Sequence, residues 1–230
     1  MDLELKDVSE MLNVSESTVR LWLAEGKIPA YYINNTYRFN RMEIENWVMK
    51  GKKEAERRAS AEAIPAESAS QGGSKQYSLY RALHRGGILN NLEGETKEEI
   101  IRNAVERIAT PLNLDPEFVG DLLLDREALQ PTALNNGLAI PHTRDFLLKD
   151  HYDVVTIAFL KKPIDYGALD GKPVDILFFL FASDDKKHLN LLAKIAHLSS
   201  QEESLRLLRK HPSKEQLLEF VKGWEAHIKA

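Results

Sequence analysis

The chain has 230 residues, of which 43% are apolar and 29% are charged, a composition typical of globular proteins and unlike that of collagen-like or disordered chains. Lys and Arg number 31 against 35 Asp and Glu, so the chain as a whole has no basic signal for nucleic acid, and any DNA contact must come from a local patch. The absence of cysteine excludes disulfides, thiolate metal sites and a cysteine nucleophile.

The sequence has no pattern of membrane insertion or export. Its longest apolar run, residues 176–182, is far shorter than the roughly 20 residues of a membrane-spanning helix. The N-terminus begins Met1-Asp2 and lacks the basic start of a signal peptide. We therefore expect a cytoplasmic protein with no membrane insertion.

Two short helices are predicted first, joined by a tight turn. Leu5, Val8 and Met11 recur at helical spacing. The run 15–18 supplies N-cap candidates for a second helix, which Gly26 ends. Two helices so close together indicate a helix-turn-helix, whose second helix can enter the major groove of DNA.

A β-hairpin and a third helix complete this N-terminal module. Residues 30–33 and 36–39 are extended runs on either side of Asn34-Asn35, and Asn tolerates the positive φ of a tight turn. Asn40 is an N-cap candidate for a third helix, whose apolar positions include Ile44 and Trp47.

The module closely resembles the excisionase-type branch of the MerR-like winged helix-turn-helix family. The resemblance spans residues 3–50, through the segments DVSEMLNVSESTVRLWLAEGKIPAYYI and YRFNRMEIENWV. It implies DNA binding, with a set of polar side chains facing the groove and basic side chains of the wing and third helix near the phosphates. The groove-facing set is Ser15, Ser17, Thr18 and Arg20, and the phosphate set is Arg38 and Arg41.

Charge argues partly against DNA binding. Residues 1–49 hold five Lys or Arg against eight Asp or Glu, so one copy should gain little affinity by neutralising phosphates. A homodimer would double the contacts. The alternative is a helical module that binds protein.

Residues 52–76 separate this module from the rest of the chain. They are rich in Ala, Ser, Glu and Gly, with one large aliphatic residue, so burial cannot offset the entropy lost on ordering them. We predict a DNA-binding domain over 1–51, a flexible linker over 52–76 and a second domain over 77–230.

The second domain is predicted to be α/β, with strands between helices. Capping signals at Thr96 and Asp115 open two helices, and the apolar positions of the second include Phe118, Leu122 and Leu129. The β-branched and aromatic runs 154–160 and 174–181 have the length of strands. Further helices are expected near 184–198, 201–209 and 213–228, which gives a layered α/β domain.

A histidine follows a short extended segment in this domain. Asn136-Gly137 turns the chain, and Pro141 restricts the backbone directly before His142. We expect the imidazole to be presented at the end of the segment rather than buried. A neutral imidazole can attack phosphorus when one nitrogen is free and the other holds its proton against a neighbour.

Two further residues suit the same chemistry. His188 falls in the first turn of the 184–198 helix, aligned with Leu192 and Ile195, so its side chain should point into the protein. Arg126 is the guanidinium candidate for neutralising phosphoryl oxygens. The alternative is a metal site of His142 and His188, but neither motif offers an obvious third ligand. We expect neither metal nor cofactor.

The order and spacing of these residues resemble the fructose/mannitol-type IIA component of the bacterial phosphoenolpyruvate:sugar phosphotransferase system, including its nitrogen-related branch. The matching motifs are Arg126-Glu127, Thr132, GLAIPH over 137–142, and KHLNLLAKIAHL, which contains His188-Leu189. The resemblance implies a mixed sheet flanked by helices, His142 as the phosphorylated nucleophile, His188 as its partner and Arg126 as the phosphoryl-stabilising group. The Thr132 hydroxyl is a further candidate contact.

The resemblance also implies partners. The phosphoryl donor would be the histidine phosphocarrier protein. The family passes the group to a cysteine of a IIB component, which must here be a separate protein because the chain has no cysteine. We expect a phosphotransferase whose phosphorylation state alters DNA binding, and thereby transcription. The alternative is a plain IIA carrier that feeds sugar uptake, with the N-terminal module used for protein contacts.

Overall fold

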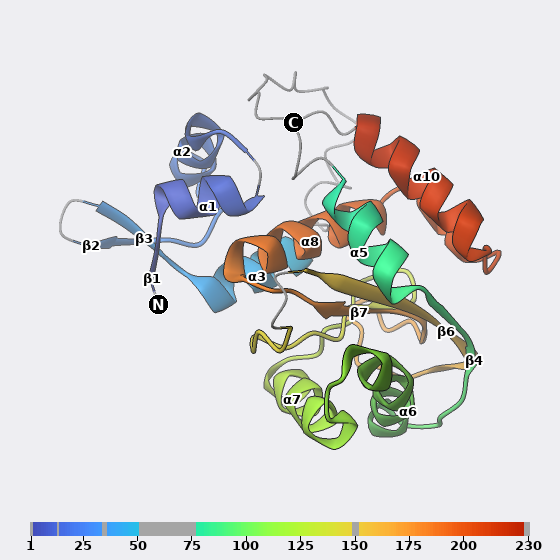
Figure 1. Ribbon diagram of the computed structural model, residues 1–230. Helices are drawn as coiled ribbons and strands as arrows, with labels where there is room; N and C mark the ends of the chain where they lie inside the picture. The colour runs from blue at the N-terminus through green and yellow to red at the C-terminus, as the bar shows by residue number, and fades with distance from the viewer. Residues whose placement is uncertain (1, 13, 34–35, 51–76, 149–151, 228–230) are drawn as a thin grey trace.

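The computed structural model describes residues 2–12, 14–33, 36–50, 77–148 and 152–227. The chain forms a small N-terminal domain and a larger α/β domain (Figure 1). The predicted linker 52–76 and the Asn34-Asn35 turn lie outside the described residues, so the predicted domain boundaries stay predictions. Among the described residues, none of the helices has the length and apolar character needed to cross a membrane.

The N-terminal domain is a winged helix-turn-helix. Helices α1 (Leu5–Leu12) and α2 (Glu16–Ala24) are followed by strands β2 (Tyr31–Ile33) and β3 (Thr36–Asn40) and by helix α3 (Arg41–Lys50). Strand β1 (Asp2–Glu4), which the sequence analysis did not predict, pairs with β3 and gives a three-stranded sheet of order β1-β3-β2.

The predicted caps of the N-terminal helices are confirmed. The Ser15 hydroxyl accepts the Thr18 N–H at 3.1 Å and begins α2. Gly26 ends the helix in the left-handed region at φ +62°, where a glycine is favoured. Asn40 Oδ1 accepts the Met42 N–H at 2.9 Å and begins α3. The domain's own core is small and holds Val8, Val19, Ile28, Phe39 and Ile44.

The C-terminal domain has a mixed sheet of order β4-β6-β7-β5. Strands β6 (Val154–Ile164) and β7 (Val174–Phe181) are antiparallel, while β4 (Ile88–Leu92) and β5 (Leu138–Ala139) pair in parallel with β6 and β7. The two central strands are buried on both faces over most of their length. Edge strand β4, with its two exposed Asn residues, was not predicted.

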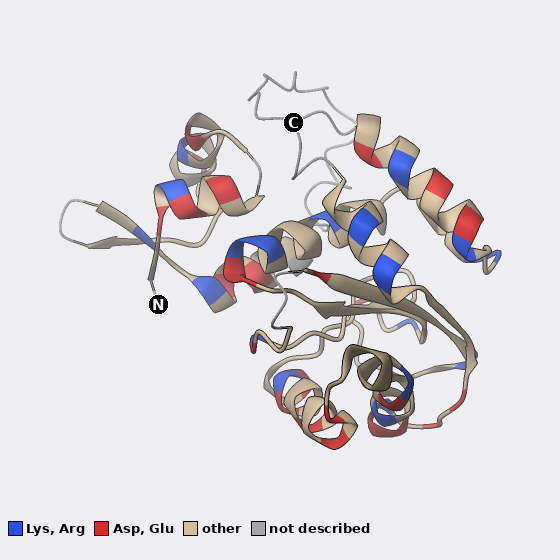
Figure 2. Cartoon of the chain, viewed as in Figure 1, with Lys and Arg blue, Asp and Glu red and all other residues tan. Residues whose placement is uncertain are grey.

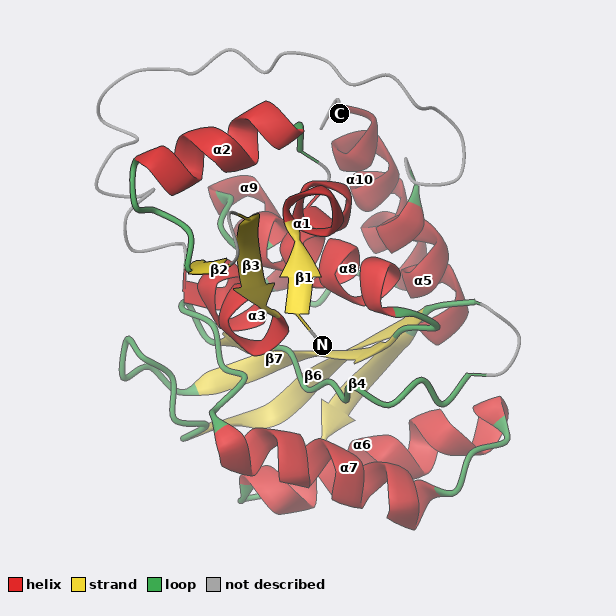
Figure 3. Cartoon of the chain, turned by 90° about the vertical axis from the view of Figure 1, so that its left-hand side faces the viewer, coloured by secondary structure: helices red, strands yellow, loops and turns green. Residues whose placement is uncertain are grey.

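Two layers of helices cover the two faces of this sheet (Figures 1 and 3). One face packs against α6 (Lys97–Ala109) and α7 (Pro116–Leu129), which are joined through the 3-10 turn η1 (Thr110–Leu112). The other packs against α5 (Ser78–Gly86), α8 (Asp185–Leu198), α9 (Glu202–Leu208) and α10 (Lys214–His227).

The predicted apolar face of α7 was wrong. Phe118 and Leu129 are mostly exposed, at 56% and 67%, whereas the buried side chains of the helix include Val119, Leu123 and Arg126. The buried Arg126 and its neighbour Glu127 occupy positions where a simple amphipathic helix would carry aliphatic residues. The sequence pattern therefore did not show which face of α7 packs against the sheet, because two of the buried positions hold charged residues.

The N-terminal domain is docked on the C-terminal domain through α1 and α3, which both contact α8 (Figures 1 and 3). Met11 of α1 is 1% exposed and belongs to the same apolar cluster as Leu189 and Leu192 of α8. At the rim of the contact, Lys186 Nζ lies 2.5 Å from Glu10 Oε2. Helix α2 and the wing formed by β2 and β3 point away from the C-terminal domain.

Candidate functional site

His142 lies at the edge of the sheet, three residues after the end of β5. A turn with Asn136 at φ 64° and Gly137 at φ 80° leads into the strand. The Leu180 N–H then donates to the Pro141 carbonyl at 3.0 Å, which holds His142 alongside β7. Two fixed backbone segments, a strand and a proline, therefore position the imidazole.

The tautomer of His142 follows from the hydrogen bond made by its Nδ1. Nδ1 lies 2.7 Å from the Ile140 carbonyl oxygen. Because a carbonyl can only accept, Nδ1 must carry the proton, which leaves a lone pair on Nε2. Nε2 is buried and has no hydrogen-bond partner among the described residues. The ring thus has the form that the sequence analysis required of a nucleophile.

His188 faces His142 from the first turn of α8. Asp184 caps this helix by accepting the Lys187 N–H at 2.9 Å. The two rings meet edge to face, with 5.1 Å between their centroids and an interplanar angle of 72°. Within the described part of the chain, neither ring nitrogen of His188 has a hydrogen-bond partner. The predicted pairing of the two histidines is therefore present in the structure.

Both histidines are fully buried, which corrects the expectation that His142 is presented to solvent. Burial, followed by the charge of Arg126, lowers the pKa of His142 from 6.5 to about 3. Burial, followed by the charge of His142, lowers the pKa of His188 well below its ordinary value. Both rings are therefore neutral at pH 7.

Arg126, on α7, lies near enough to both rings for its positive charge to lower the pKa of His142 and of His188. One of its terminal nitrogens donates to the Gln130 carbonyl at 3.0 Å, while the buried Nε has no partner among the described residues. Burial lowers the pKa of Arg126, although a guanidinium stays charged at pH 7. The three residues singled out from the sequence, Arg126, His142 and His188, are thus brought together.

Thr132 is buried but engaged elsewhere. Its hydroxyl donates to Glu127 Oε2 at 2.5 Å, and its backbone N–H donates to Glu127 Oε1 at 3.0 Å. Lys97 Nζ also lies 3.0 Å from that carboxylate. Glu127 therefore fixes the loop between α7 and β5, and the predicted contact of the Thr132 hydroxyl with phosphate stays a prediction.

Three charged residues near the histidines were not assigned to this site from the sequence. Arg144, two residues after His142, lies with its Nε and terminal nitrogen 3.3 and 3.2 Å from Glu45 Oε2. Arg41 Nε donates to Glu45 Oε1 at 3.0 Å and its guanidinium also pairs with Asp185. Arg144 could have been found from its place beside the GLAIPH motif, but Glu45 lies in the other domain and gave no signal.

For the alternative metal site of His142 and His188, the described residues offer no third ligand. Among the residues that the structure describes, no group of three or more His, Asp or Glu side chains gathers as a metal site would require. The basic groups whose charges act on His142 are Arg126, Arg144 and Arg41. A cluster of positive groups favours an anion over a cation at this place.

The predicted DNA-facing residues divide into two groups. Ser17 and Arg20 are exposed on α2, and Ser15 and Thr18 lie half-buried at its start, where their hydroxyls are 2.8 Å apart. Arg38 lies on the wing and pairs with Glu4 at 2.5 Å. These five residues lie on or beside the outward α2 and wing.

Arg41 differs from the prediction that it would stand near DNA phosphates. Its side chain is 17% exposed and turned toward the C-terminal domain, because Glu45 and Asp185 both attract its guanidinium. The wing itself is mostly uncharged, whereas charges of both signs meet where α3 contacts α8 (Figure 2). The inward position of Arg41 separates it from the other five candidates.

Comparison with known proteins supports both parts of the chain. A family described as "Phosphoenolpyruvate-dependent sugar phosphotransferase system, EIIA 2" matches residues 82–224, and one described as "Helix-turn-helix domain" matches residues 3–52. The chain is 33% identical over 146 residues to a nitrogen regulatory protein of Pseudomonas aeruginosa, covering 62% of this chain and 94% of that one.

Two further relatives agree. A mannitol-specific phosphotransferase enzyme IIA component of Geobacillus stearothermophilus is 29% identical over 140 residues, which is 60% of this chain and 94% of that one. The crystal structure of nitrogen regulatory protein IIA-Ntr from Neisseria meningitidis superposes with a TM-score of 0.53 at 27% identity, covering 62% of this chain and 94% of that one.

The fold, the order of the site motifs and these similarities lead to one assignment. The resemblance and the fold class predicted from the sequence are both confirmed. Because the matched family covers more than half of its length, the chain belongs to the EIIA 2 family of the phosphoenolpyruvate-dependent sugar phosphotransferase system, and it carries a helix-turn-helix domain ahead of the EIIA 2 domain.

Proposed function

We propose that Nε2 of His142 accepts a phosphoryl group from a phosphohistidine donor, the histidine phosphocarrier protein that the family resemblance implies. The Nε2 lone pair forms a bond to phosphorus while the donor's N–P bond breaks. A donor ring protonated on its other nitrogen then leaves as neutral imidazole, and His142 becomes a phosphoimidazolium that keeps its Nδ1 proton. The hydrogen bond from Nδ1 to the Ile140 carbonyl supports this step, because it directs the lone pair to Nε2.

The neighbouring residues suit a transfer that depends on position and charge. Arg126 brings a permanent positive charge close to both rings, where it can neutralise phosphoryl oxygens as charge builds up in the transition state. The rings of His188 and His142 pack edge to face. The neutral ring of His188 can donate a hydrogen bond to a phosphoryl oxygen from one nitrogen.

Transfer of radiolabelled phosphate from phosphoenolpyruvate, through enzyme I and the phosphocarrier protein, tests this proposal. We expect stoichiometric, acid-labile labelling of the chain and none in His142→Ala. The matched control is His84→Ala, because His84 is exposed on α5 and far from the site in sequence. Labelling of His142→Ala equal to that of the control would exclude His142 as the acceptor.

We further propose that α2 and the wing bind duplex DNA, so that the chain is a phosphotransferase-linked regulator of transcription. The match to a helix-turn-helix domain and the outward direction of α2 support this. Selection of bound duplexes from a random pool by the full chain should return one enriched sequence. If retention stays at the nonspecific level, the plain IIA carrier that serves a separate IIB component is the better description.

A further inference from the structure

Glu45 of α3 is a fully buried carboxylate that is held by both domains. It is 0% exposed, and its two oxygens accept from Arg41 of the same helix and from Arg144 of the C-terminal domain. Its charge also acts on Arg126, whose pKa it raises against the larger effect of burial. A carboxylate so placed makes the contacts that a bound anion would make.

The site around Glu45 has unused hydrogen-bonding capacity for an anion. Arg126 Nε and a terminal nitrogen of Arg41 are buried donors, and neither has a hydrogen-bond partner among the described residues. His142 Nε2, the unprotonated nitrogen that would carry the phosphoryl group, is buried without a partner among them as well. Buried polar atoms without partners are uncommon in folded proteins and call for an explanation. A phosphoryl group on His142 would offer three acceptor oxygens to the two guanidinium groups.

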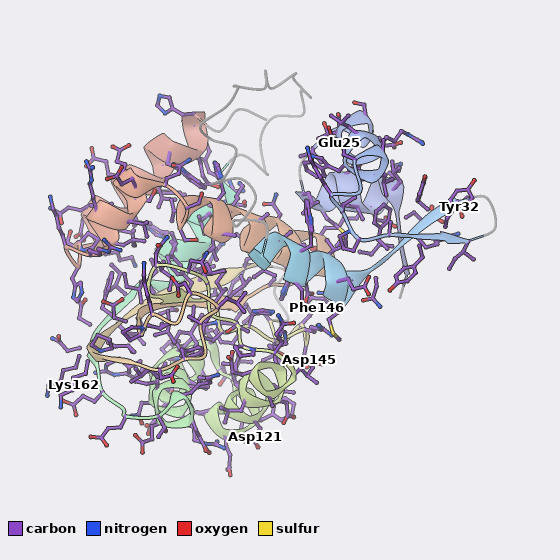
Figure 4. The ribbon with its side chains drawn as sticks, turned by 180° about the vertical axis from the view of Figure 1, so that it is seen from behind. Glu25, Tyr32, Asp121, Asp145, Phe146 and Lys162 are labelled. Atoms are coloured by element: carbon purple, nitrogen blue, oxygen red, sulfur yellow. The ribbon has the colours of Figure 1, made fainter. Side chains whose placement is uncertain are left out.

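The contacts of α3 place it beside both histidines. Arg144 follows His142 by two residues, and Asp185, which pairs with Arg41, precedes His188 by three. The Arg41 guanidinium also lies over the Phe146 ring, 5.9 Å from its centroid. Figure 4 shows Phe146 beside α3 at the boundary between the domains. With α3 in this position His142 is fully buried, and no donor protein can reach Nε2.

We propose that Glu45 is an internal competitor of the phosphoryl group: its carboxylate holds Arg144 and docks the N-terminal domain over His142, so that docking and phosphorylation of His142 exclude each other. This inference rests on the proposed function of His142. Two partners then compete for one surface, which consists of the start of α8 and the loop that holds Arg144. These are the chain's own N-terminal domain and a donor protein that carries phosphohistidine.

Electrostatics predicts how phosphorylation of His142 shifts docking of the N-terminal domain. Phosphorylation adds close to two negative charges where Glu45 already supplies one, and like charges repel strongly away from water. The phosphoryl oxygens and the Glu45 carboxylate would also compete for the Arg41 guanidinium. Phosphorylation therefore favours release of the N-terminal domain, and docking slows phosphorylation.

The switch does not work by covering the DNA-binding face. Helix α2 and the wing point away from the C-terminal domain while the domains are docked, and Figure 4 shows Tyr32 of the wing far from Phe146. Release would instead free the orientation of the N-terminal domain, which sets the spacing of half-sites that two copies can occupy.

A covalent cross-link between the two domains tests the proposal. The chain has no native cysteine that would compete for the cross-linking reagent. Lys186 and Glu10 form an ion pair across the domain contact, so Glu10→Cys with Lys186→Cys can be joined by a short bismaleimide in the full chain. We expect efficient cross-linking before phosphorylation and little after it. We also expect the cross-linked chain to accept phosphoryl at least tenfold more slowly than the same variant left unlinked.

Glu45→Gln tests the carboxylate itself. Loss of the charge should loosen docking and speed phosphoryl uptake several-fold, while lowering the cross-link yield in the double-cysteine background. Glu43→Gln is the matched control. Glu43 lies on the same helix, but its carboxylate accepts a hydrogen bond from the Tyr31 hydroxyl of the wing at 2.6 Å. The control should leave both uptake and cross-linking unchanged.

The outcomes separate this inference from the proposed function. If the linked and unlinked chains take up phosphoryl equally fast, or if no cross-link forms, docking does not cover His142 and the inference is wrong while the proposed function stands. Equal rates for Glu45→Gln and Glu43→Gln would show that the carboxylate is not the competitor. If no variant is labelled at all, the proposed function fails and this inference fails with it.

Discussion

The two faces of the N-terminal domain are built from different residues and meet different surroundings. On the outer face, α2 buries only Val19, and the wing exposes Tyr31, Tyr32 and Ile33. On the inner face, Met11 and Glu45 are fully buried against the C-terminal domain. The surface proposed for DNA is therefore separate from the surface that docks. A signal from His142 must then act through docking rather than through direct cover of α2.

We expect the largest effect from a substitution in the C-terminal domain, beneath the inner face of the N-terminal domain. Arg126→Gln removes the guanidinium proposed to stabilise the phosphoryl group, and loss of such a group typically slows transfer about 100-fold or more. Single-turnover transfer from the phosphorylated phosphocarrier protein measures the rate. DNA binding by the same variant should not change, because Arg126 lies far from the outer face.

Arg102→Gln is the control for this prediction. Arg102 lies exposed on α6, where it pairs with Glu98 and Asp121, so its replacement removes the same charge outside the site. We expect wild-type transfer from this variant. Equal loss in both variants would mean that Arg126 acts through the general charge of the domain and not at the phosphoryl group.

The next effect concerns the apolar part of the inner face. Met11→Ala leaves a cavity where α1 packs on α8 and should weaken docking by about 2 kcal/mol, which is roughly 30-fold in the docking equilibrium. Hydrogen exchange of the amides in the first turn of α8 reports the opening. Leu21→Ala, an exposed position of the outer face, should change nothing. Equal protection in the two variants would show that α1 does not hold the domains together.

An effect of similar size is expected from the buried histidines. The pKa of His142 is lowered from 6.5 to about 3, so the folded state favours the neutral ring, and this contribution is complete above pH 6.5 and lost as the pH falls toward 3. At pH 5 the loss should be about 2 kcal/mol. Urea unfolding of wild type and His142→Asn at pH 7 and pH 5 measures it. A wild-type loss no greater than that of the variant would contradict the burial of the ring.

The sequence predicted the parts of the molecule that depend on local signals. Ser15, Asn40 and Asp115 begin helices because short polar side chains can accept backbone N–H groups, and this chemistry is visible in a few neighbouring residues. Arg126, His142 and His188 were found because their motifs keep a fixed order along the chain. Their convergence then follows from the sheet and from the capped helix.

Other features depend on contacts between residues far apart in the sequence. Strand β1 forms because β3 offers it an edge, and three residues alone carry no strand signal. The inward turn of Arg41 depends on Asp185 of the other domain and on Glu45, a carboxylate that counted from the sequence only as one more negative charge against DNA binding. The full burial of His142 likewise involves residues far from it in the sequence. Pairs of this kind leave no trace in local periodicity.

The smallest expected effect belongs to the outer face and tests it alone. Arg20 is exposed on α2, and its ion pair with Glu16 is long, at 4.0 Å, so its charge is available to a DNA phosphate. Arg20→Ala should lower DNA affinity a few-fold and reduce the slope of log affinity against log salt by about one. Phosphoryl uptake should stay at the wild-type rate, since the side chain lies outside the docking surface. An unchanged salt slope would remove α2 from the DNA contact, whereas slower phosphoryl uptake would show that the two faces are not independent.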